Sequence, residues 1–76
     1  MQHYNTVDTA LASYLSVNGH PFNLQELTNG QFSFCFTDSK ELETLAHSFE
    51  AGYAEGNIAQ FYREYKRLLK MVKNGI

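Results

Sequence analysis

The feature that most constrains the fold is a pair of alternating apolar runs on either side of the dipeptide Asn29-Gly30. Phe22 and Leu24 alternate with polar residues before this dipeptide, and phenylalanines alternate with polar residues at positions 32, 34 and 36 after it. A period of two is the pattern of a strand with one buried face, and Asn-Gly is a strong signal for a tight turn. The sequence therefore predicts an antiparallel β-hairpin over residues 22–36.

Two registers of this hairpin compete, and they place different side chains on the same face. A two-residue turn on Asn29-Gly30 separates Phe22 and Leu24 from the phenylalanines of the following strand. A three-residue loop with Gly30 in a left-handed bulge pairs Leu24 with Phe34 instead. We choose the second register because it gathers five apolar side chains on one face. These are Phe22, Leu24, Phe32, Phe34 and Phe36.

Two helical segments flank the hairpin. Residues 7–17 are predicted as a helix with Thr6 as N-cap and with Val7 at the start of its buried stripe. A second helix is predicted to run from Asp38, as N-cap, to about residue 51, with Glu41 completing a capping box. Both segments carry apolar residues at helical spacing, so one face of each is expected to be buried.

A third helix is predicted from Ile58 to Lys73, with Asn57 as N-cap. Tyr53, in the loop before it, is predicted to anchor that loop to the core. The predicted buried stripe of this helix consists of Ile58, Phe61, Tyr65, Leu69 and Val72.

The expected fold class is α+β, in the order helix, strand, strand, helix, helix, with one domain over residues 1–76. Three helices are expected to pack on one face of the antiparallel hairpin. A chain of 76 residues has a small core, and a two-stranded hairpin has two unpaired edges. Two copies could pair these edges into a larger, four-stranded sheet, so we expect a homodimer.

The positive charges are concentrated near the C-terminus. Five of the six Lys and Arg residues lie after residue 62, whereas the preceding part carries seven acids against Lys40 alone. At helical spacing these five cations fall within about 120° of the helix circumference, and Tyr62 borders them. The predicted partner-binding residues are Tyr62, Arg63, Lys66, Arg67, Lys70 and Lys73.

Three interpretations of this cationic band stay open. The favoured one is a protein partner with an acidic surface, or a second copy of the chain. The alternative is a nucleic-acid backbone, although the isoelectric point of 5.8 is low for that role. In the third, the cations cover apolar edges and pair with acids of the second helix, Glu41, Glu43 and Glu50.

Nothing in the sequence indicates an enzyme, a cofactor or a metal site. Cys35 is the single cysteine, which excludes an internal disulfide. Cys35 and His47 are the only pairing that would suggest a nucleophile and a base, and no third catalytic group accompanies them. His3, His20 and His47 lack the spacing of metal ligands. No signal peptide or membrane-spanning run is present, so we expect a non-enzymatic cytoplasmic protein that does not bind membranes.

Core, cap and turn residues form a pattern along nearly the whole chain. They are Thr6-x-Asp8-x-x-Leu11-Ala12-x-Tyr14-Leu15 with Gly19-His20, then Phe32-x-Phe34-x-Phe36-x-Asp38, then Leu42 to Phe49, Gly52, Asn57, Phe61, Tyr65-Lys66 and Leu68. This pattern resembles a family of short bacterial and phage domains of unknown function. The resemblance implies the fold and a setting in a phage or mobile element, where the protein would act as a regulator or inhibitor. It supplies no active site.

Overall fold

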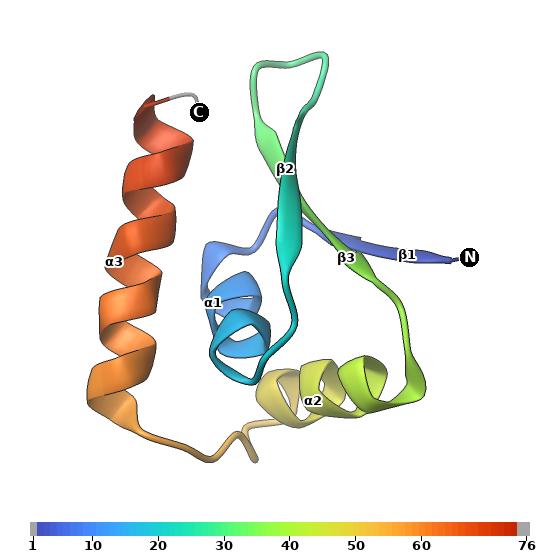
Figure 1. Cartoon of the computed structure of the whole chain (residues 1–76), viewed down its shortest axis with the longest axis vertical. Coiled ribbons are helices and arrows are strands. Elements are labelled where there is room, and N and C mark those ends of the chain that lie inside the picture. The colour runs from blue at the N-terminus through green and yellow to red at the C-terminus, as the bar shows by residue number, and fades with distance from the viewer. Residues whose placement is uncertain (1, 75–76) are drawn as a thin grey trace.

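The computed structural model describes residues 2–74, which form a three-stranded sheet and three helices (Figure 1). In chain order the elements are β1 (His3–Thr6), α1 (Thr9–Val17), β2 (Phe22–Glu26), β3 (Phe32–Thr37), α2 (Lys40–Glu50) and α3 (Ile58–Asn74). The predicted α+β class is confirmed, and the predicted order of helix, hairpin, helix, helix is preceded by one further strand, β1.

The hairpin has the register chosen from the sequence. Leu24 lies opposite Phe34 and Phe22 opposite Phe36 in the antiparallel pair of β2 and β3. Gly30 adopts a positive φ of 82°, and its N–H donates a 3.0 Å hydrogen bond to the carbonyl of Leu27, which closes the turn. The alternation of phenylalanines and the bulge glycine together set this register.

The strand β1 pairs with β3, so β3 is the central strand of the sheet order β1-β3-β2. Tyr4 lies opposite Phe36 and Thr6 opposite Phe34. The expectation that the sheet within one chain has only two strands is therefore wrong. The two edges of the sheet are therefore those of β1 and β2, so edge pairing between two copies would involve one of these strands and not β3.

The first helix begins two residues later than predicted, because Thr6 belongs to β1. Its N-cap is Asp8, whose Oδ1 accepts hydrogen bonds from the N–H groups of Ala10 and Leu11 at 3.0 and 3.3 Å. The Thr6 hydroxyl accepts a bond from the N–H of Asp8, at 3.0 Å. Val7, predicted to be buried, lies in the connection between strand and helix and is exposed.

The second helix is capped by Ser39 and not by Asp38, since the Ser39 Oγ accepts the N–H of Leu42 at 3.1 Å. At its other end Gly52 has a φ of 86° and donates to the carbonyl of Phe49, while Tyr53 N–H donates to the carbonyl of Ser48. This pair of bonds is a Schellman motif, which fixes the backbone at Tyr53. The predicted anchoring role of Tyr53 is wrong within this chain, because its side chain is 78% exposed.

The core lies between one face of the sheet and the helices. Its buried residues come from every helix and from the central strand: Leu11, Ala12, Leu15, Phe34, Phe36, Leu42, Ala46 and Leu68. Tyr4, Phe22 and Leu24 pack against them from the sheet. The opposite sheet face is polar, with His3, Asn5, Asn23 and Gln25 exposed and Cys35 half-buried.

The third helix packs with a face slightly rotated from the predicted one. Phe61, Tyr65 and Val72 are half-buried as predicted, but Leu68 is the buried residue and Leu69 is exposed. Ile58, also predicted to be buried, is 83% exposed. Adjacent helix positions differ by about 100°, so exchanging Leu69 for Leu68 rotates the buried face by less than a third of a turn.

We predict that Leu68→Ala and Leu69→Ala differ sharply in stability, although both remove the same atoms. Leu68 is fully buried, so its truncation should lower the free energy of unfolding by about 2–5 kcal/mol. Truncation of exposed Leu69 should change it by less than about 0.5 kcal/mol. Urea unfolding of both variants measures the difference, and equal losses would contradict the described packing of α3.

Candidate functional site

The candidate site is the side of α3 that faces away from the rest of the molecule. The helix stands at one flank, next to α1, with no other described element on its far side (Figure 1). On this side lie four exposed cations, Arg63, Lys66, Lys70 and Lys73, about half a turn around the helix from buried Leu68. We call these four residues the cationic face.

An apolar strip borders the cationic face. It consists of Ile58, Tyr62 and Leu69, which are 83%, 56% and 43% exposed. The Nζ of Lys66 lies 5.3 Å from the centroid of the Tyr62 ring, within the range of a cation–π contact. The outer side of α3 therefore presents apolar side chains and positive charges together.

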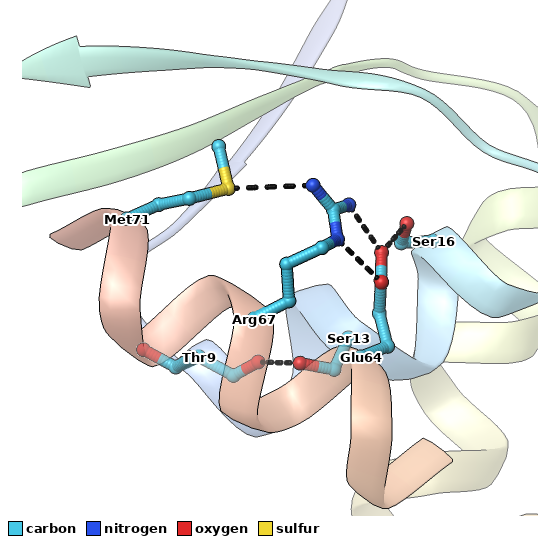
Figure 2. A network of polar contacts seen from close by, with 6 residues as sticks. All are labelled: Thr9, Ser13, Ser16, Glu64, Arg67 and Met71. Carbon is cyan, nitrogen blue, oxygen red and sulfur yellow. Dashed lines mark hydrogen bonds and ion pairs between the residues drawn. The ribbon is translucent and has the colours of Figure 1, made fainter. Parts of the chain in front are cut away.

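Arg67, the fifth predicted cation, is bound by two neighbouring side chains of α3, Glu64 and Met71 (Figure 2). Its guanidinium donates two hydrogen bonds to the Glu64 carboxylate, from Nε to Oε1 at 2.8 Å and from Nη2 to Oε2 at 2.7 Å. Its Nη1 contacts the sulfur of Met71 at 3.6 Å. The side chain is half-exposed, but its charge is compensated by Glu64.

Glu64 also joins α3 to α1. Its Oε2 accepts a hydrogen bond of 2.5 Å from the Ser16 hydroxyl, which lies on α1 (Figure 2). The bonds from Arg67 hold the pKa of Glu64 below its ordinary value, against the opposing effect of partial burial. The same pair raises the pKa of Arg67. The Ser16, Glu64 and Arg67 cluster is therefore a polar clip between the two helices.

The acids of α2 do not neutralise the cationic face. Within residues 2–74, no ion pair joins these four cations to an acid. Glu41 is near a histidine instead, with its Oε1 3.3 Å from the Nε2 of His20. Glu43 is next to Asp38, and a hydrogen bond with Asp38, together with the Asp38 charge, raises the pKa of Glu43. Within residues 2–74, none of the five cations pairs with an acid of the second helix, and Arg67 is paired instead with Glu64 of its own helix.

The other candidate chemistry is dispersed over the fold. Cys35 points to the sheet face opposite α2, so it does not meet exposed His47 of that helix. In the part of the chain that the structure describes, no three metal-ligating side chains are grouped around one point. Over the same part, every helix is too short or too polar to cross a membrane.

Comparison with known proteins places the chain in a family. The model of this family, described as a domain of unknown function, DUF5659, matches residues 1–74, and the chain belongs to it. The resemblance to a family of unknown function is thereby confirmed. Neither the curated proteins nor the solved structures contain a match to this chain.

We predict that Glu64→Gln removes an acid-sensitive part of the stability. Because the folded-state pKa of Glu64 is below its ordinary value of 4.5, its ionised form stabilises the fold above that pH, and this contribution disappears as the pH falls through the folded pKa. The variant should lose about 1 kcal/mol at pH 7 and less at acidic pH. Urea midpoints from neutral to acidic pH measure both effects.

The matched variant Glu43→Gln should show the opposite sign. The raised pKa of Glu43 means that the folded state binds its proton more tightly, so this group favours the fold as the pH falls. Its removal should raise stability at pH 7 and steepen the loss in acid. Parallel pH profiles for the wild type and both variants would contradict the assigned pKa directions.

Proposed function

We propose that this domain is a non-enzymatic protein-interaction module that binds an acidic surface of a partner through the cationic face of α3 and Tyr62. The observation that carries this proposal is that one side of α3 is packed on α1 while the other side is exposed and positively charged. Leu68 and the polar clip hold one side on α1, whereas Arg63, Lys66, Lys70 and Lys73 are exposed and without an acid partner within residues 2–74. A helix with one buried side and one charged free side is suited to docking.

The apolar strip favours a protein over a nucleic acid as the partner. Ile58, Tyr62 and Leu69 lie beside the cations, and aliphatic side chains gain free energy when they are covered by another apolar surface. Phosphate backbones offer no such surface. The net charge of −2 also opposes attraction of a polyanion to the domain as a whole. Nucleic-acid binding by Tyr62 and the same cations is the second candidate.

Three further parts of the proposal rest on sequence reasoning. The domain would act in the cytoplasm, where a single cysteine that forms no internal disulfide is common. It would regulate or inhibit its partner in a phage or mobile element, as the family resemblance implies. It would also self-associate, because a chain of 76 residues has a small core.

We predict that the triple variant Lys66→Glu, Lys70→Glu, Lys73→Glu binds the partner at least about tenfold more weakly, because like charges then face an acidic surface. The partner is captured with the wild-type domain, identified by mass spectrometry and purified. Calorimetry then gives the affinity of each variant. Lys40→Glu, which reverses the one cation outside α3, is the control and should bind like the wild type.

An unchanged affinity of the folded triple variant would contradict the proposal. The second candidate is tested with labelled single- and double-stranded DNA and RNA, followed by fluorescence anisotropy. Binding that falls steeply between about 50 and 200 mM salt, and that the triple variant loses, would support nucleic-acid binding instead.

A further inference from the structure

Two hollows adjoin in the groove between the end of α1 and the first half of α3. The first, of about 220 Å³, has an aromatic floor formed by Tyr14, Phe49 and Phe61. The second, of about 390 Å³, is lined by charged groups that include Arg63. Val17 and Gln60 line both, so the two hollows are neighbours on the surface. We call them the apolar hollow and the charged hollow.

The apolar hollow suits one large side chain. Its floor is a row of rings, with centroid distances of 5.3 Å from Tyr14 to Phe49 and 6.2 Å from Phe49 to Phe61. Sites for small-molecule ligands occupy about 300–1,000 Å³, so this volume is small for a cofactor. A further aromatic ring would extend the row at favourable distances. The amides of Asn18 and Asn57 line the same hollow and could bond a hydroxyl group.

The charged hollow carries one uncompensated positive charge. Two guanidinium groups and one carboxylate line it, and Glu64 is already bonded to Arg67 and Ser16. Arg63 is left without an acid partner within residues 2–74. The groove as a whole therefore suits an aromatic side chain that is followed closely by an acidic one.

The chain itself presents that combination on the rim of the same groove. Tyr53 is 78% exposed, and Glu55, two residues further on, has no ion pair in the part that the structure describes. The Schellman motif fixes the backbone at Tyr53, so the ring projects from an ordered position and its binding costs little further backbone entropy. Residues 54–58 line the apolar hollow, which places this projection immediately beside it.

We propose that Tyr53 of one copy inserts into the apolar hollow of a second copy, with Glu55 of each copy facing Arg63 of the other. A twofold interface brings the same patch of two molecules together, so a projection and a hollow on one patch can engage reciprocally. The inference deepens the proposed function, because it supplies the surface for self-association. That surface is separate from Lys66, Lys70 and Lys73.

Sedimentation equilibrium over about 10 µM to 1 mM protein tests the interface. We expect the wild type to shift from the 8.7 kDa monomer towards twice that mass. Tyr53→Ser should raise the dissociation constant at least about tenfold, because it removes the central aromatic anchor. Val7→Ser, which removes another exposed apolar side chain outside the groove, is the control and should leave the dimer unchanged.

Charge exchange tests the pairing of Glu55 with Arg63. Glu55→Lys and Arg63→Glu should each weaken the dimer, and the two together in one chain should restore it, because each pair then has opposite charges again. The control double variant, Glu26→Lys with Lys40→Glu, keeps the same net charge and should dimerise like the wild type. Wild-type protein that stays monomeric, a dimer insensitive to Tyr53→Ser, or a double variant without recovery would overturn the inference. These outcomes would not contradict the proposed binding of a partner by the cationic face. That proposal is tested separately, with variants of Lys66, Lys70 and Lys73.

Discussion

The packing of α3 on α1 is the constraint on which both proposed surfaces depend. Leu68 is the one fully buried residue of α3, and the bond from Ser16 to Glu64 joins the two helices beside it. Met71 and Val72 pack beside Leu68, but apolar contacts are non-directional, whereas a polar clip with directional bonds limits rotation of the helix about its axis. The rotation decides which cations face solvent. It also aligns Arg63 with the end of α1, and so creates the charged hollow.

The hairpin and the helical segments could be predicted because local signals agreed there. Asn29-Gly30 and the alternating phenylalanines allow only one register that buries all five apolar side chains, and the structure has this register. The strand β1 has no comparable signal, since it is four residues long and carries one aromatic residue, Tyr4. Thr6 is equally compatible with a helix cap and with a strand, and pairing with β3 determines the outcome.

The site was partly predictable for a similar reason. The cations of α3 are visible in the sequence, and the spacing of three residues between Glu64 and Arg67 could have indicated that this pair would form on the helix. The exposure of Leu69 could not be foreseen, because Leu68 and Leu69 are chemically identical and only the position of α1 distinguishes them. The two hollows combine residues of both helices and of the loop before α3, so they exist only in three dimensions.

Arg63 belongs to the cationic face and also lines the charged hollow, so the two proposed interactions are coupled. A partner that pairs with Arg63 competes with Glu55 of a second copy, and self-association then weakens partner binding by the same factor as the partner weakens self-association. A partner that contacts only Lys66, Lys70 and Lys73 leaves Arg63 to the dimer. In that case a twofold dimer presents two copies of the cationic face, and a partner with two acidic segments is bound more tightly because its second contact is intramolecular. The geometry of one arginine therefore determines whether self-association opposes or reinforces the binding of a partner.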